Sequence, residues 1–407
     1  MTAPDPVERA WRAERAAIVA SLARRLGDLA LAEDAVQDAF AAAAARWPAE
    51  GVPDAPGAWL TTTAWRRALD VLRREQRRRP TELPPDLAAE APRAGLRAGD
   101  EPLDELLGLL LACCHPALAP EARVALTLRH VAGLTAGEIA ASFVVGEAAM
   151  AKRLVRARVK LRDAGVSFAV PEGAALRARL ADAQAVIYLV YTEGHLASGD
   201  GPPVRAELCG EAVWLARQLH ALAPDDAETA GLLALLLFLQ ARRAARLAPD
   251  GRLRPLAEQD RSRWSAPLME EARGLLAAAH GGTLGPYQIE AAIAALHAAA
   301  PTAAATDWAH VASLYALLDR VAPSPVATVN RAVAVGHAEG ADAGLAVLAP
   351  VVEGGRLDDY VPLHAARAEL FARAGRADDA REAWRRAAAL ADNDAQRRHF
   401  GEKADAA

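Results

Sequence analysis

The chain has 407 residues, of which 53% are hydrophobic and 24% charged, and its formal net charge is −5. This length predicts two or three domains, and the small net charge excludes a chain that is basic throughout. Three cysteines, two of them adjacent, exclude a disulfide framework and favour a reducing cytoplasm. Ala, Leu, Arg and Glu dominate and aromatic residues make up only 5%, so we predict an all-α fold.

Two features argue against a membrane location. The start of the chain lacks the apolar core of a secretory signal. The most apolar run, residues 231–239, is about half of the ~20 residues needed to cross a bilayer. We therefore expect a soluble, cytoplasmic protein with no membrane partner, in which this run is a buried helix.

Residues 7–47 predict two helices broken near Gly27. In the second helix Leu29, Val36 and Phe40 recur at positions i, i+7 and i+11 and form one apolar stripe. A separate polar arc comprises Glu33, Asp34, Gln37 and Asp38. A loop with several Pro and Gly residues is expected from Pro48 onward.

A helix rich in arginine is expected over residues 59–79. Residues 64–79 carry seven Arg against two acids, a local balance of +5. One third of the helix circumference holds Arg66, Arg67, Asp70, Arg73, Arg74 and Arg77. Asp70 is expected to brace the neighbouring arginines. Trp65 is a candidate for stacking on unpaired bases, with core packing as the alternative, and for Trp59 core packing is favoured.

An acidic segment follows this helix. Residues 80–105 hold seven acids against two Arg, a balance of −5, and the stretch from Pro80 to Pro102 contains five prolines. This composition favours a flexible linker over residues 81–102. Three or four helices are then expected between Leu103 and about Leu161.

Residues 135–161 predict a helix-turn-helix. Thr135 and Glu138 match a capping box, which opens a helix with Ile139, Ala140 and Phe143 facing inward. The next helix has an apolar stripe of Met150, Leu154, Ala157 and Leu161. A different arc carries Lys152, Arg153, Arg156 and Lys160. This arrangement favours DNA binding in the major groove over the alternative, a basic helix that caps a bundle.

Residues 147–162 carry six Lys or Arg against one acid, again a balance of +5. Two cationic helix faces on one chain predict a polyanionic partner bound at two places. The alternative is that each charge run is an ordinary solvated face.

The order of these motifs closely resembles bacterial extracytoplasmic-function (ECF) sigma factors. The resemblance rests on AEDAVQDAF (residues 32–40), WLTTTAWRRALDVLRR (59–74) and LTLRHVAGLTAGEIAASFVVGEAAMAKRLVRARVKL (126–161), and it covers about residues 7–165. It implies a sigma region-2 helical bundle over residues 1–80, the linker 81–102 and a region-4 helix-turn-helix over residues 103–168. The implied partners are the RNA polymerase core enzyme and promoter DNA.

The resemblance also implies roles for individual residues. The region that contacts core polymerase would include Asp34, Gln37, Asp38 and Phe40. The minus-ten promoter element would face Trp65, Arg66, Arg67, Arg73 and Arg74. The minus-thirty-five element would face Lys152, Arg153 and Arg156.

Residues 169–407 form a separate helical region with 24 basic and 30 acidic residues beyond residue 170, a balance of −6. Segments such as LLACCHPALAPEARVALTLR (110–129) and YLVYTEGH (188–195) resemble the sigma-factor subgroup with a C-terminal tetratricopeptide-like domain. Residues 364–390 fit one such unit through Ala368, Phe371, Gly375, Ala380, Trp384 and Ala387. We expect a regulatory domain that binds a peptide or protein partner; the alternative is a rigid appendage.

Several residues with chemical potential are interpreted as structural. Cys113 and Cys114 lack the spaced pairs of a zinc site. The segment Tyr191–His195, and Glu290 with His297, have no nucleophile or phosphate loop beside them. We therefore expect no metal, no cofactor and no enzyme activity. The function predicted is a sigma factor with a modulatory C-terminal domain; the alternatives are a stand-alone helix-turn-helix regulator and a scaffold that has lost sigma function.

Overall fold

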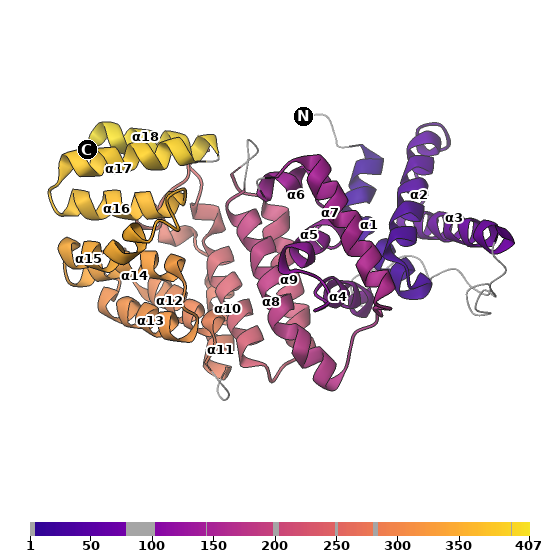
Figure 1. The fold of residues 1–407 in the computed structure, drawn as a ribbon, viewed down its shortest axis with the longest axis horizontal. Helices are drawn as coiled ribbons and strands as arrows, with labels where there is room; N and C mark the ends of the chain where they lie inside the picture. Colours follow the sequence, from indigo (N-terminus) through magenta and orange to yellow (C-terminus); the bar gives the residue numbers. More distant parts are fainter. Residues whose placement is uncertain are drawn as a thin grey trace. The chain divides into compact units, whose positions relative to one another are not determined.

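The computed structural model describes residues 5–78, 102–143, 145–197, 203–248, 251–279, 284–391 and 393–407. Within these ranges the chain is helical, and the only extended pairing is an isolated bridge between Leu247 and Leu253 (Figure 1). The predicted all-α fold is confirmed. The chain divides into two compact units, Met1–Val190 and Tyr191–Ala407, and the division falls inside a long helix, α8 (Gly173–His195).

The first unit begins with three packed helices, α1 (Pro6–Leu26), α2 (Leu29–Glu50) and α3 (Pro56–Arg78). The predicted break between α1 and α2 is confirmed: Gly27 has φ of +67°, and the Asp28 carboxylate accepts hydrogen bonds from the backbone N–H groups of Ala30 and Leu31. The loop predicted from Pro48 begins later than expected, at Gly51, since α2 includes Pro48 and ends at Glu50. The buried Trp47 ring packs edge-on against Trp59 and anchors this last turn.

The first unit continues with α4 (Pro102–Cys113), α5 (Pro120–His130), α6 (Ala136–Ser142), α7 (Glu147–Asp163) and most of α8. The predicted capping box is confirmed, since the backbone N–H of Thr135 donates to the Glu138 carboxylate and the N–H of Glu138 donates to the Thr135 hydroxyl. The predicted stripe of α7 is buried. Val144 in the turn, and residues 81–101 of the predicted linker, lie outside the described residues.

Cys113 and Cys114 are fully buried at the end of α4, in the core position that the sequence favoured. Burial raises the pKa of both thiols, that of Cys114 to about 12. In the described part of the chain no cluster of three or more His, Cys, Asp or Glu residues has the arrangement of a metal site.

The second unit is a succession of packed helices (Figure 1). They are α9 (Ala206–Leu222), α10 (Ala227–Ala241), α11 (Ala266–Ala278), α12 (Pro286–Ala299), α13 (Trp308–Val321), α14 (Pro325–Ala338), α15 (Ala341–Glu353), α16 (Val361–Arg373), α17 (Ala377–Leu390) and α18 (Asp394–Ala406). Three short 3-10 helices, η2 (Arg243–Ala245), η3 (Leu256–Glu258) and η4 (Arg261–Arg263), lie between α10 and α11. The apolar run 231–239 lies in α10, and its residues 231–238 are buried. None of the described helices is both long enough and apolar enough to cross a membrane.

The helical pair predicted over residues 364–390 is present as α16 and α17. Gly375 occupies the turn between them with φ of +72°, a conformation that favours glycine. Ala368 and Ala380 are fully buried, and Trp384 packs between the helices and the Phe400 ring of α18. Small residues at the crossing therefore let these helices approach closely, as the sequence spacing indicated.

Candidate nucleic-acid and polymerase interfaces

The basic face of α3 is exposed to solvent. Its outward side chains include Arg66, Arg67, Arg73 and Arg74. Asp70 lies 3.8 Å from Arg73, and both side chains are more than half exposed. An exposed pair of this kind adds little stability, so the arginines stay available to a polyanion.

The two tryptophans of α3 pack inside the unit. Trp65 is only 3% exposed, and the guanidinium of Arg25 lies 5.9 Å from its ring centre. Trp59 contacts Trp47 edge-on at 5.7 Å between ring centres, which agrees with the core packing favoured for it. In this conformation the Trp65 indole is not available for base stacking, and its part in minus-ten recognition stays a prediction.

The residues predicted to contact polymerase lie on α2 in two environments. Asp34, Gln37 and Asp38 are exposed side chains that a protein partner can reach. Phe40 is 4% exposed and its ring contacts Trp11 edge-on at 4.8 Å. The structure thus brings the three polar residues to the surface, while Phe40 supports the helix from inside.

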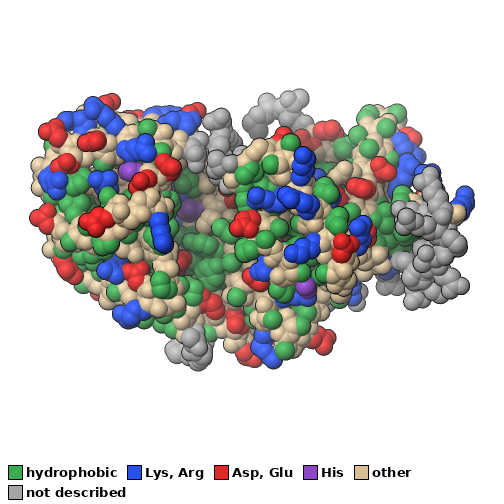
Figure 2. Space-filling model, viewed as in Figure 1, with side chains coloured by type: hydrophobic (Ala, Val, Ile, Leu, Met, Phe, Trp, Pro, Cys, Tyr) green, Lys and Arg blue, Asp and Glu red, His purple; other side chains and the backbone are tan. Residues whose placement is uncertain are grey.

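Helix α7 presents the cations of the predicted recognition helix. Lys152 and Arg156 are exposed, and Arg153 is half-buried with its guanidinium 5.7 Å from the Phe143 ring. Figure 2 shows basic side chains gathered over α6 and α7. The helix is held from beneath by its buried Met150 and Leu154. This is the arrangement that leaves one cationic face free for a DNA groove.

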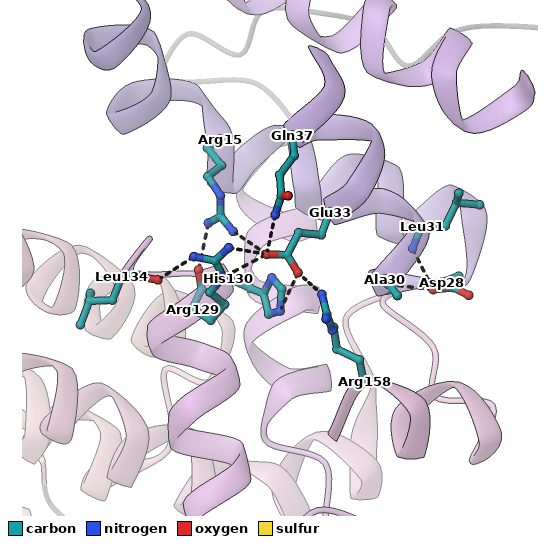
Figure 3. A network of polar contacts seen from close by, with 10 residues as sticks. All are labelled: Arg15, Asp28, Ala30, Leu31, Glu33, Gln37, Arg129, His130, Leu134 and Arg158. Atoms are coloured by element: carbon teal, nitrogen blue, oxygen red, sulfur yellow. Dashed lines mark hydrogen bonds and ion pairs between the residues drawn. The ribbon is translucent and has the colours of Figure 1, made fainter. Parts of the chain in front are cut away.

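A second feature of the first unit is a buried cluster around Glu33, which we call the Glu33 cluster (Figure 3). The Glu33 side chain is 3% exposed and that of Arg15 2%. The Glu33 carboxylate is paired with the guanidinium groups of Arg15 (3.3 Å), Arg129 (2.9 Å) and Arg158. The Nε2 atom of His130 lies 3.8 Å from Oε2 of Glu33. One carboxylate thus binds together α1, α2, α5 and α7.

The electrostatics of the cluster follow from its burial. Burial raises the pKa of Glu33. The electrostatic effects of His130 and of the surrounding arginines outweigh that effect and hold the pKa of this carboxyl below its usual value. Burial lowers the pKa of His130 to about 3, so the imidazole is neutral at pH 7. Burial also lowers the pKa of Arg15 to about 10, which leaves it charged. At neutral pH the arginines therefore supply the positive charge that holds the carboxylate ionised.

Glu33 was predicted to lie on the polar arc of α2, and its role in the cluster was not predicted from the sequence. A signal was present, because Glu33 lies at i+4 from Leu29 and at i−3 from Val36, on the apolar stripe itself. Its partners could not be found in this way. Arg129 and Arg158 are 96 and 125 residues away in the sequence.

Comparison with protein families assigns two segments of the first unit. Residues 10–78 match Sigma-70 region 2, and residues 108–161 match Sigma-70, region 4. Helices α1, α2 and α3 therefore constitute region 2, and region 4 contains α5, α6 and α7. Residues 179–280 match a family of unknown function, DUF6596.

Comparison with curated proteins gives relatives of two kinds. The Uncharacterized protein R00370 of Rhizobium meliloti (strain 1021) is 40% identical over 400 residues, which cover 97% of this chain and 94% of that protein. The Probable ECF RNA polymerase sigma factor SigI of Mycobacterium tuberculosis (strain ATCC 25618 / H37Rv) is 34% identical over 176 residues, 42% of this chain and 59% of that protein. No solved structure matches the chain. The chain therefore belongs to one family with R00370, and its regions 2 and 4 make it an RNA polymerase sigma factor related to the ECF sigma factors.

Proposed function

We propose that this sigma factor uses α3 for the minus-ten element and α7 for the minus-thirty-five element, while the exposed face of α2 binds core polymerase. The observation that carries the proposal is the position of the cations, which are exposed on two separate helices of regions 2 and 4. Arginine and lysine contacts to phosphates supply affinity, and contacts to base edges supply specificity. Arg66 and Arg67 on α3, and Lys152 and Arg156 on α7, are the exposed residues proposed for these contacts.

We infer further that the described conformation of the first unit precedes promoter binding. The two promoter elements lie roughly 25 base pairs apart, or about 85 Å along B-form DNA. Glu33 holds residues of α2, in region 2, and α5 and α7, in region 4, within ion-pair distance of one carboxylate. Regions joined in this way cannot reach both elements at once, so the Glu33 cluster must open when the promoter is bound.

The polymerase contact is tested by gel filtration of the full chain with core polymerase. The wild type is expected to co-elute with the core enzyme, and Asp34→Arg is expected to reduce that association because it reverses one charge on the exposed face of α2. Asp54→Arg is the matched control, since Asp54 is an exposed acid outside α2. Equal association of Asp34→Arg and the control would contradict the assignment of this face.

The promoter contact is tested by transcription in vitro from a promoter that the wild type uses. Arg156→Ala removes one exposed cation of α7 and is expected to lower transcription, with association to core polymerase unchanged. Arg205→Ala, outside region 4, serves as control. Transcription that is undiminished by Arg156→Ala would remove this residue from the recognition role.

We also propose that the C-terminal unit modulates activity through a peptide or protein partner of its helical repeats. The support is its acidic charge balance in a chain whose regions 2 and 4 carry cationic helices. The test compares transcription by the full chain with that by a chain ending at His195, the last residue of α8. An unchanged rate and an unchanged response to cell extract would contradict modulation.

A further inference from the structure

Arginine side chains gather at one end of α10 in the second unit. Arg242 follows the last residue of α10, Arg246 follows η2, and Arg261 is the first residue of η4. The guanidinium groups of Arg242 and Arg261 lie 5.9 Å and 4.5 Å from the centre of a Trp264 ring. We call Arg242, Arg246 and Arg261 the guanidinium cluster.

The guanidinium cluster has no carboxylate partner in the part of the chain that the structure describes. None of its three side chains lies within 4.0 Å of an Asp or Glu oxygen there. Burial lowers the pKa of Arg242 to about 10, and Arg246 and Arg261 act in the same direction, with opposition only from Tyr191. Arg242, Arg246 and Arg261 are half-buried, and like charges held together with limited access to water cost free energy unless an anion compensates them.

Backbone carbonyls compensate the cluster only in part. Arg261 Nη1 donates to the carbonyl oxygens of His297 (2.6 Å) and Ala300 (2.8 Å), at the C-terminal end of α12. Arg246 donates to the carbonyl oxygen of His195. Such contacts stabilise helix ends. Among the described residues, however, Arg261 Nη2 is buried with no hydrogen-bond partner, and the Arg242 guanidinium makes no hydrogen bond.

Neutral polar groups around the cluster are also unpartnered. Trp264 Nε1, His297 Nδ1 and Tyr191 Oη are buried, and none has a hydrogen-bond partner within the described ranges. Trp264 is 6% exposed and Tyr191 fully buried. Buried polar groups are nearly always hydrogen-bonded in proteins, so several unpartnered donors beside unpaired cations indicate an acceptor that the chain itself does not supply.

We propose that the guanidinium cluster and these donors form a binding site for a small oxyanion, the carboxylate or phosphate group of a metabolite. The planar fork of a guanidinium matches both groups through paired hydrogen bonds. The burial of Trp264 and Tyr191 fits a small molecule better than the side chain of a folded protein. Tyr191 and His297 had been interpreted from the sequence as structural, because no nucleophile or phosphate loop lies beside them.

The test is isothermal titration of the full chain with inorganic phosphate and, separately, with succinate, each against NaCl at equal ionic strength. At least one of the two anions is expected to bind at one site per chain. At ten times its Kd it should raise the Tm of the second unit, which contains the site, by about 4 °C above the NaCl reference. This result is independent of sigma activity, so it separates the anion site from the proposed promoter and polymerase contacts.

Three variants decide whether binding occurs at this place. Arg242→Met keeps the length of the side chain and is expected to abolish both the heat of binding and the Tm shift. Arg243→Met changes its exposed neighbour and should leave both intact. Trp264→Phe removes a single donor and should weaken binding several-fold with the fold retained. No one-site binding of either anion to the wild type, or an equal response from wild type, Arg242→Met and Trp264→Phe, would overturn the proposal.

Discussion

The replacement Glu33→Gln tests whether the Glu33 cluster holds regions 2 and 4 together. It preserves the size of the side chain and one carbonyl oxygen, but it removes the negative charge that is paired with Arg15, Arg129 and Arg158. Because Glu33 and Arg15 are almost completely buried, water cannot replace that charge. Loss of one partner of a buried ion pair costs about 3–5 kcal/mol.

We call the arrangement in which the Glu33 cluster joins regions 2 and 4 closed, and an arrangement in which these ion pairs are broken open. The replacement is expected to shift the molecules from the closed toward the open arrangement. A cost of about 3–5 kcal/mol lowers the ratio of closed to open molecules by roughly a hundred-fold to several thousand-fold. The distance between spin labels reports this change. Cysteines introduced at the exposed positions Ala41, on α2, and Val159, on α7, accept the labels. The native cysteines are buried and should not react.

The control is Glu50→Gln, which removes the partner of Arg46 in an exposed ion pair of 2.9 Å on the same helix. Solvent screens such pairs, so the label distance should stay that of the wild type. If Glu33→Gln gave the same narrow distance distribution as this control, and the same resistance to urea, the reasoning about the Glu33 cluster would be refuted.

Two further predictions concern stability. Burial lowers the pKa of His130 from 6.5 to about 3, so the unfolded chain binds one more proton than the folded chain between these pH values. Relative to His130→Gln, the free energy of unfolding of the wild type should fall by up to about 1.4 kcal/mol per pH unit below pH 6.5, as measured by urea unfolding. If the free energies of unfolding of the two proteins changed in parallel with pH, this prediction would be contradicted. Trp384→Ala should destabilise the second unit by about 3–5 kcal/mol, because the ring fills the core between α17 and α18. A loss below about 1 kcal/mol would count against that packing.

Local sequence signals predicted the features that depend on neighbouring residues. The capping box at Thr135 and the break at Gly27 rest on contacts within three or four residues, and both are present. The apolar stripe of α7 predicted which of its faces is buried. The same periodicity left Lys152 and Arg156 on the exposed side. A helical period therefore determined both the recognition helix and its cationic face.

The loop expected from Pro48 shows where such signals fail. Proline commonly ends a helix, yet α2 continues to Glu50, because tertiary packing of Trp47 on Trp59 holds the final turn. Trp65 makes the same point. A periodic pattern could not separate base stacking from core packing for this ring, and its burial beside Arg25 is a result of how the helices assemble.

The sequence by itself determined an all-helical chain with two cationic helices in the order of a sigma factor, because these properties follow from composition, helical period and motif order. Only the tertiary structure decided which charges are compensated. Glu33 is paired with arginines 96 and 125 residues away, and the guanidinium cluster combines the two arginines that flank η2 with one from η4. The physical reason is that the free energy of a buried charge depends on every group that packs around it, whatever its distance along the chain.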